Sequence, residues 1–313
     1  MLTRKYFICF CFTFGFLEQV QADSSSDPPT PWLTGPLIAP AGLVVPYGQF
    51  EIEPYLYFST NTGVYNSHWK AISANQNFFS LDVQLFTYFG LTSIIDINII
   101  PQFFYNNVSN QNSTGFGDLT VALDIQLLDP DSTQYFPGIK FTLRETFPTG
   151  KYQRLDPRKL GTDLTGGGTF GTDFNLVFYK VYFLGRSHFL STTYSASYQI
   201  NSPVTVHGLN AYGIAPKKGT TAYPGTLFQG IVSFELTLTQ NWVLALDNVY
   251  TRVSATKLNQ GLKTPSSDQI SFAPAFEYNF NSNVGVAIGC WFTAWGRNSP
   301  IFRTAVIDLV CSY

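Results

Sequence analysis

Apolar and polar side chains alternate with a period of two along most of the chain. In 81–85 and 95–99 every second residue is aliphatic, and the residues between them are polar or acidic. The same alternation recurs in 119–127, 190–199 and 228–238. Successive side chains of a β-strand point to opposite faces. Each of these segments is therefore predicted to be a strand with one apolar face and one polar face.

Strands of this kind account for most of the chain. The predicted strands are 49–60, 77–89, 93–106, 116–128, 138–147, 172–183, 188–200, 225–238, 242–253, 269–280, 284–296 and 302–313. Each has about the 9–11 residues, or more, that a tilted strand needs to cross a bilayer, and no mature stretch approaches the roughly 20 apolar residues of a spanning helix. The pattern predicts an all-β fold, a transmembrane antiparallel up-and-down β-barrel of about 12 strands.

The connections alternate in length, as bacterial barrels require. Short connections are predicted at 90–92, 129–131, 184–187, 239–241 and 281–283. Long loops are predicted at 61–76, 107–115, 148–171, 201–224 and 254–268. Pro54, Pro101 and Pro274 lie inside predicted strands, where each removes a ladder donor, so we expect a bulge at each of them.

The N-terminal residues precede the alternating region. Residues 1–22 have the features of a signal peptide, with Arg4 and Lys5 before an apolar stretch and a cleavage site near Ala22. Residues 23–48 form a Pro-rich arm that can be neither helix nor ladder strand. The arm either lies in the periplasm or tucks into the pore. Residues 49–313 form the predicted barrel, located in the bacterial outer membrane.

The last predicted strand is a specific feature. Cys311, Leu309, Ile307 and Ala305 alternate with polar residues up to the terminal Tyr313. A terminal aromatic residue that closes an alternating strand resembles the assembly signal of bacterial outer-membrane proteins. We therefore expect the barrel assembly machinery to be a partner of this strand. An ordinary edge strand that happens to end the chain is the alternative.

Composition agrees with this fold. The chain has 313 residues, of which 17% are aromatic and 12% charged, about half of the roughly 25% charged residues of an average soluble domain. A formal net charge of -2 gives no electrostatic reason to expect nucleic acid as a partner. Aromatic residues near strand ends suit girdles at the membrane interfaces. They are Trp242, Trp291, Trp295, Tyr250 and Tyr278.

Most acidic side chains fall on the polar face of the strands, which must point into the barrel. These acids are Glu51, Glu53, Asp82, Asp96, Asp124, Asp173, Glu235, Asp247, Glu277 and Asp308. Only a few bases, Lys140 and Arg144, share that face. The lumen is predicted to be acidic. The expected selectivity groups of the pore wall are Asp82, Asp96, Asp124, Glu235 and Glu277, with Arg144 as their countercharge.

This interior fits two arrangements equally well. The polar groups either line a narrow channel or fill a hydrogen-bonded plug. An acidic wall favours cations or neutral solutes. Basic residues lie mainly in the long loops, and Arg252 and Arg303 point outward at the rim. We expect these two arginines to contact lipopolysaccharide phosphates, although a solvated charged rim is an equal alternative.

Residues with catalytic or metal-binding chemistry are few. None of His68, His188 and His207 has the His-x-Ser neighbour of the outer-membrane phospholipase, and no His or Cys pair has metal-ligand spacing. The mature chain keeps only Cys290 and Cys311, which are expected to be free thiols. No cofactor and no metal is expected, and a lipid-active enzyme is the weakest of the functional alternatives.

Several glycine-led motifs resemble a known family. They are 115–123 (GFGDLTVAL), 147–150 (FPTG), 168–173 (GTFGTD) and 270–278 (ISFAPAFEY). They are similar to motifs of the outer-membrane channel family associated with the meta-pathway of phenol degradation, and the likeness spans about 40–313. The resemblance implies uptake of hydrophobic or aromatic compounds, and it supplies no catalytic residues.

Together these features predict a monomeric porin-like channel for passive uptake of small molecules through an acidic lumen. Outer-membrane lipid, lipopolysaccharide and a small solute are the expected partners. The alternative is a closed barrel whose surface loops have a structural or adhesive role.

Overall fold

A computed structural model of the chain describes residues 30–130, 135–186, 188–213, 219–259, 261 and 263–313. The predicted signal peptide lies outside the described residues. Within them, no helix is long and apolar enough to cross a membrane. The one helical segment of this part of the chain is a single 3-10 turn, η1 (Pro157–Lys159).

The described residues are otherwise strands and connections. The strands are β1 (Phe50–Tyr65), β2 (Ala71–Gly90), β3 (Ile95–Ile100), β4 (Gln102–Val108), β5 (Gln111–Phe116), β6 (Leu119–Leu128), β7 (Gly138–Phe147), β8 (Gly171–Gly185), β9 (His188–Asn201), β10 (Val204–Val206), β11 (Thr220–Tyr223), β12 (Leu227–Thr237), β13 (Trp242–Val253), β14 (Lys257–Leu258), β15 (Ser267–Asn279), β16 (Val284–Arg297) and β17 (Pro300–Ser312).

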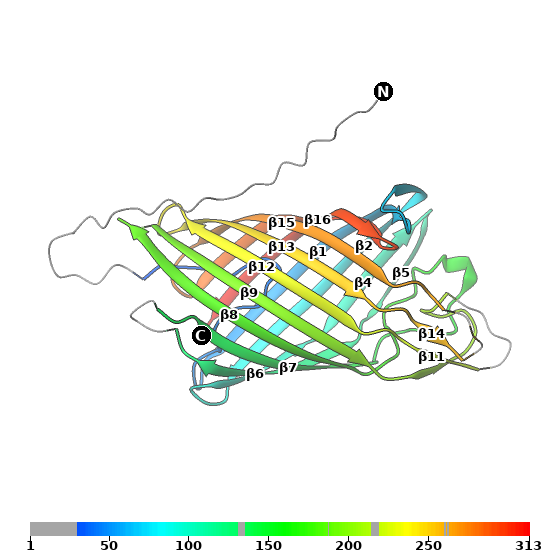
Figure 1. Ribbon diagram of the computed structural model, residues 1–313, viewed down its shortest axis with the longest axis horizontal. Helices are drawn as coiled ribbons and strands as arrows, with labels where there is room; N and C mark the ends of the chain where they lie inside the picture. Colours follow the sequence, from blue (N-terminus) through cyan, green and yellow to red (C-terminus); the bar gives the residue numbers. More distant parts are fainter. Residues whose placement is uncertain (1–29, 131–134, 187, 214–218, 260, 262) are drawn as a thin grey trace, which may run out of the picture.

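The long strands close into an antiparallel barrel (Figure 1). β1 pairs with β2 on one side and with β17 on the other, which joins the first strand to the last. β3 and β4 together form one wall strand, interrupted at Pro101, and β5 and β6 form another, interrupted at 117–118. The wall therefore has 12 strands, in the order predicted from the alternation. The predicted fold class is confirmed.

The two ends of the barrel differ. One end, called here the turn end, carries the short connections, such as those between β2 and β3 and between β15 and β16. The other, the loop end, carries the long connections and a small sheet of β10, β11 and β14, of which β11 and β14 are seen beyond the wall in Figure 1.

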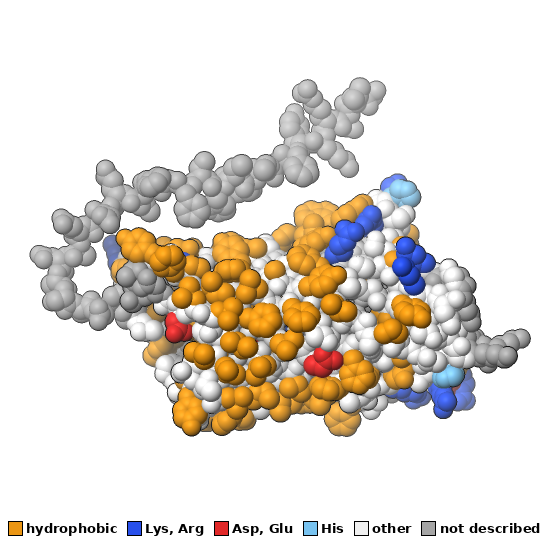
Figure 2. All heavy atoms as spheres, turned by 60° about the horizontal axis from the view of Figure 1, so that its bottom comes forward, with side chains coloured by type: hydrophobic (Ala, Val, Ile, Leu, Met, Phe, Trp, Pro, Cys, Tyr) orange, Lys and Arg blue, Asp and Glu red, His pale blue; other side chains and the backbone are white. Residues whose placement is uncertain are grey.

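The outer wall is apolar. Figure 2 shows hydrophobic side chains over the middle of the wall, with Lys and Arg mainly toward the loop end. Trp242 and Trp295 are exposed near strand ends, in keeping with a girdle. Trp291 does not belong there: it packs against the buried cluster inside the barrel and donates a hydrogen bond to the Ser271 hydroxyl at 2.9 Å. Its expected girdle position was wrong because it lies on the inward-facing side of β16.

Two predicted long loops are shorter than expected. The connection between β1 and β2 spans only 66–70, because both strands continue past the membrane-spanning length. Residues 71–77 are exposed on both faces, so alternation is lost there although the strand continues. The connection between β4 and β5 is a two-residue turn at Ser109 and Asn110, both with positive φ, the geometry of a tight hairpin.

Two of the three strand prolines, Pro54 and Pro274, do not create the expected bulges. On the β1–β2 side Pro54 pairs with Leu85 in unbroken register, and on the β13–β15 side Pro274 pairs with Leu246 in the same way. The register shifts of these two strands lie elsewhere, at 61–63 and 270–271. Pro101 interrupts its strand without changing the register toward β2. Toward β5 and β6 the register does shift by one residue there, since Ile100 pairs with Thr120 but Phe103 pairs with Phe116, so the bulge expected at Pro101 is present and its extra residue lies on the partner strand. Each proline lacks one N–H, and at Pro54 and Pro274 the wall accommodates the loss without an inserted residue.

Candidate functional site: the barrel lumen and its arm

The Pro-rich arm enters the barrel from the turn end and returns to it. The carbonyl of Thr30 accepts a hydrogen bond from Gln240, in the turn between β12 and β13, at 3.1 Å. The chain then rises to Ile38 near the middle of β13 and comes back to Pro46, beside Gly90 at the end of β2. Of the two positions left open by the sequence, the described part of the predicted arm occupies the lumen, and residues 23–29 lie outside the described residues. Residues 30–46 are called the lumen arm below.

Carboxylates of the inner wall bind backbone N–H groups of the lumen arm. Glu277 accepts from Thr34 at 3.2 Å, Asp247 from Ile38 at 2.7 Å and Asp96 from Val45 at 2.6 Å. Asn279 and Gln126 supply further side-chain oxygens to the arm, at 3.1 and 3.2 Å. The arm has no regular secondary structure, so its N–H groups would otherwise be unpaired inside the barrel. Hydrogen bonds to charged groups contribute about 1.5–3 kcal/mol each.

Packing adds to these hydrogen bonds. Leu37 is 1% exposed and lies in a cluster with Tyr55 and Val306 and with small residues of β13, β15 and β16. The small residues are Ala245, Ala273, Ala275 and Ala287. A Cβ on Gly289 would stand 2.6 Å from the Leu37 side chain. The inward side chains of the wall are therefore small where the arm passes, which leaves space for Leu37.

The predicted pore-lining residues lie on the inner side of the wall. Among the acids, those buried are Glu53, Asp96, Asp124, Asp173, Glu235, Asp247, Glu277 and Asp308. Glu51 accepts a hydrogen bond from the Ser312 hydroxyl at the turn end, and Asp82 accepts one from Gln84 at 2.6 Å. Only part of the set therefore contacts the arm. The role of these residues in a conducting pore stays a prediction.

The countercharge of the acids differs from the expectation. Lys140 lies 3.8 Å from the carboxylate of Asp124, and both side chains are buried. Asp96 lies opposite Asp124 in the β3–β6 register, so the ammonium lies close to a pair of carboxylates. Among the described residues, Arg144 makes no ion pair with any acid. Lys140, and not Arg144, is the countercharge of Asp124: the two bases lie one inward position to either side of Thr142, which pairs with Asp124, and only the Lys140 ammonium comes within ion-pair distance of the carboxylate.

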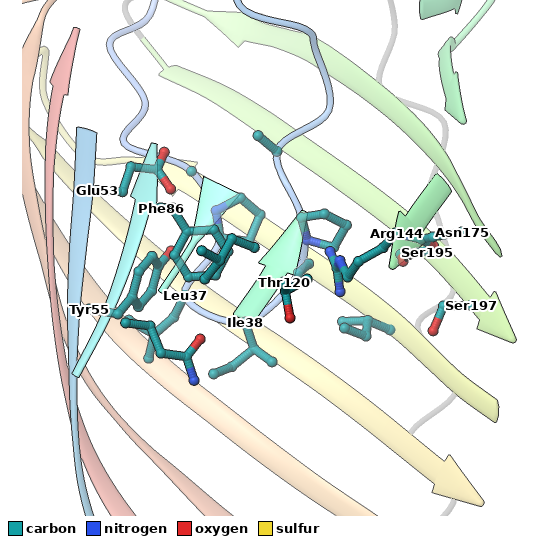
Figure 3. Close-up of a pocket in the computed structure, with 18 of the residues that line it drawn as sticks. Leu37, Ile38, Glu53, Tyr55, Phe86, Thr120, Arg144, Asn175, Ser195 and Ser197 are labelled. Atoms are coloured by element: carbon teal, nitrogen blue, oxygen red, sulfur yellow. Dashed lines mark hydrogen bonds between the residues drawn. The ribbon is translucent and has the colours of Figure 1, made fainter. Parts of the chain in front are cut away.

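Two cavities flank the arm. One, of about 250 Å³, is bordered by residues 34–41 of the arm, by Tyr55 on β1 and Phe86 on β2, and by Arg144 on β7 (Figure 3). The other, of about 430 Å³, opens toward the turn end and is bordered by Glu51 and Tyr313. Both cavities share residues 34–36 and Glu53 as lining residues. The lumen is therefore divided by the arm into a loop-side cavity and a turn-side cavity.

The loop between β7 and β8 is ordered by charged hydrogen bonds at the loop end. Asp118 accepts from the backbone N–H groups of Gly150 at 2.8 Å and Gly167 at 2.7 Å. Burial alone would raise the pKa of Asp163, but hydrogen bonds and charge from Lys151 lower it below its usual value. Hydrogen bonds from Arg158 lower the pKa of Asp156 to about 2. Asp156 and Asp163 therefore stay ionised at neutral pH, and the hydrogen bonds of all three acids hold the loop in place.

Of the residues that receive the arm, the acids were named from the sequence and the small residues were missed. A charged residue in an alternating strand indicates an inward position, whereas an alanine or a glycine such as Gly289 is compatible with either face and gives no such indication. Their signal is a run of small residues at inward positions of three successive wall strands, β13, β15 and β16. Within the described residues, no group of three or more His, Cys, Asp or Glu side chains is arranged to hold a metal ion, and Cys290 and Cys311 are free thiols.

The chain resembles solved outer-membrane barrels in structure. No family model and no curated protein matches it. It superposes on the crystal structure of an outer membrane channel from Pseudomonas putida F1 with a TM-score of 0.67, at 14% identity, covering 88% of this chain and 100% of that chain.

Two further solved structures align more weakly. The transport unit of the autotransporter AIDA-I from Escherichia coli gives a TM-score of 0.48 at 10% identity, covering 85% of this chain and 90% of that one. The CymD monoaromatic hydrocarbon channel gives 0.39 at 8% identity, covering 86% and 89%. At these identities the similarity to the Pseudomonas channel establishes the fold alone, and the resemblance to the phenol meta-pathway family stays a prediction.

Proposed function

We propose that the protein is an outer-membrane channel for passive uptake of small molecules, aromatic compounds among them, through an acidic lumen. The observation that carries the proposal is the closed wall with polar groups inside, which encloses cavities on both sides of the lumen arm. A barrel that served only as an anchor would need no cavities of this size. The structural similarity to a Pseudomonas putida outer membrane channel supports the proposal, and the aromatic lining of the loop-side cavity suits aromatic solutes.

Conductance in planar bilayers tests this function. We expect small discrete conductance steps with a preference for cations, because the inner wall carries more acids than bases. In the double variant Asp96→Asn, Glu235→Gln the cation preference should fall, as measured by a reversal potential that moves toward zero in a salt gradient. The amide introduced at position 96 still offers an oxygen to the Val45 N–H, so the arm keeps this contact. An unchanged reversal potential would contradict the acidic selectivity wall.

The alternative is a closed barrel whose loops act at the surface, and the lumen arm is the observation that favours it. The arm fills part of the lumen and is bonded to opposite sides of the wall, at Asp247 on β13 and Asp96 on β3. A folded, heat-modifiable barrel that conducts neither with nor without the arm would establish the closed barrel.

We also propose that lipopolysaccharide contacts the wall at Arg252 and Arg303. Arg252 lies 3.4 Å from Asp268, with about half of its side chain exposed. Arg303 is exposed and borders a hollow of about 420 Å³ whose other lining residues include Cys290 and Ala305. A guanidinium beside an apolar hollow fits a phosphate with an acyl chain next to it.

The double variant Arg252→Gln, Arg303→Gln should bind lipopolysaccharide several-fold more weakly than the wild type, since two phosphate donors are lost. Co-purifying lipopolysaccharide, quantified per barrel, measures this. Arg186→Gln is the matched control, because Arg186 is an exposed arginine at the turn end. Equal lipopolysaccharide content in all three proteins would refute the contact.

A further inference from the structure

Arg144 is an inward cation for which the described residues supply neither a hydrogen bond nor an ion pair. It lies on β7 directly opposite Asp173 of β8 in the register, yet the two side chains form no ion pair within 4.0 Å. Its buried Nε has no hydrogen-bond partner among the described residues. Lys140, the other inward cation named above, is occupied by Asp124 and by the carbonyl of Leu43. The N–H donors of Arg144 are thus available to a group that enters the lumen, and the Asp173 carboxylate opposite competes with that group through its charge.

The surroundings of Arg144 are polar. In the loop-side cavity the guanidinium points toward the space above the arm, and Asn175, Ser195 and Ser197 lie on the same side (Figure 3). Thr120 also lines this part of the cavity. Hydroxyl and amide groups around a guanidinium can share the second oxygen of a bound anion, and they place no further negative charge there.

The opposite side of the same cavity is aromatic. Tyr55 and Tyr57 of β1 stack with ring centroids 5.6 Å apart, and Phe86 lies 5.1 Å from Tyr55. Tyr88 continues the row at 6.3 Å from Phe86. Tyr55 and Phe86 lie on the other side of the cavity from Arg144, with Leu37 and Ile38 of the arm between them in the view of Figure 3. Tyr57 and Tyr88, on inward positions of the same two strands, also line the cavity. The four rings are called the aromatic wall.

The two sides together define a ligand. A guanidinium matches a carboxylate through two parallel N–H donors, and the aromatic wall offers ring contacts. A hydrocarbon would remove water from Arg144 without replacing its hydrogen bonds, which is unfavourable. A phosphate dianion would carry twice the charge into an acidic lumen, with a single guanidinium to offset it. A monocarboxylate with its ring at the aromatic wall keeps its charge away from Glu53, which lies on the aromatic side.

We propose that Arg144 and the aromatic wall form a binding subsite for small aromatic monocarboxylates inside the barrel. This subsite rests on the proposed channel function and names one class of its solutes. A cavity of about 250 Å³ holds one such molecule without displacing the arm. The acidic lumen would then repel most anions, whereas aromatic monocarboxylates would bind at the one place where Arg144 offsets their charge.

Equilibrium binding of benzoate to the refolded full-length chain at pH 7, followed by calorimetry, tests the subsite. Arg144→Gln should weaken benzoate binding by about tenfold or more, as expected for the loss of charged hydrogen bonds, whereas benzyl alcohol binding should change little. Arg144→Lys should lie between. Asp173→Asn removes the nearest negative charge and should tighten benzoate binding. Arg158→Gln, at an exposed loop arginine already bound to Asp156, is the control for loss of a positive charge.

The outcomes separate the subsite from the channel. Benzoate binding without conductance would retain the subsite and reject the channel. Conductance without benzoate binding, or an equal loss of benzoate and benzyl alcohol binding in Arg144→Gln, would overturn the subsite. If Asp173→Asn weakened benzoate binding as much as Arg144→Gln does, Arg144 would be a structural partner of Asp173, and the subsite would fall as well.

Discussion

Deleting residues 30–46 is expected to raise the single-channel conductance several-fold. The lumen arm separates the two cavities and is held across the barrel by Asp96, Asp247 and Glu277. Removing it joins the cavities along the barrel axis, and water replaces the arm at the carboxylates. The closed wall does not depend on the arm, because β1 pairs with both β2 and β17 from residue 50 onward. Conductance in planar bilayers, compared at one salt concentration, measures the change.

A milder variant tests the same contacts without a deletion. Asp96→Ala with Asp247→Ala removes two of the acceptors of the arm, so brief openings to the conductance of the deleted chain should appear. In the deleted chain the same two substitutions should alter ion selectivity but not conductance. Asp156→Ala, which removes a loop carboxylate distant from the arm, serves as the control. An unchanged conductance after deletion of the arm would show that the arm does not limit permeation.

The arm also shows where sequence patterns stop being informative. Proline content excludes a helix and disfavours a ladder strand for the Pro-rich arm, residues 23–48, but nothing in that composition says where an irregular segment goes. The information lies in the wall, where inward acids can accept N–H groups and inward alanines leave space for Leu37. These residues are distant from the arm in sequence, so only the closed barrel brings them together.

The strands were predictable for a physical reason with a clear limit. Alternation holds where one face meets lipid and the other the lumen, and there it located every wall strand in order. Beyond the membrane both faces meet water, so 71–77 is strand without alternation. Trp291 shows the converse limit: it lies in the middle of β16 and on its inward face, so it packs inside the barrel and does not belong to an interfacial girdle. To assign the environment of a side chain, both its position along the strand and the face of the strand on which it lies must be known.

Replacing Lys140 by Met is expected to destabilise the barrel by about 3–5 kcal/mol, the usual cost of leaving a buried charge without its partner. The side chains of Lys140 and Asp124 are only 3% and 5% exposed. Asp96 lies opposite Asp124, and Thr142 donates its hydroxyl to Asp124. Without the ammonium, two neighbouring carboxylates face each other in the wall. Denaturant titration of the refolded protein in lipid vesicles measures the free energy of unfolding.

The double variant Lys140→Met, Asp124→Asn distinguishes charge from packing. It removes both members of the ion pair, so it should recover most of the stability that Lys140→Met loses. Lys151→Met is the matched control: its ammonium is bonded to Asp163 at 2.5 Å but is about half exposed, and such pairs contribute about 0–1 kcal/mol. An equal loss in the single and double variants would mean that the packing of the lysine chain, and not the orphaned carboxylate, sets the cost. Recovery in the double variant would establish Lys140 as the residue that allows paired acids to exist inside this barrel.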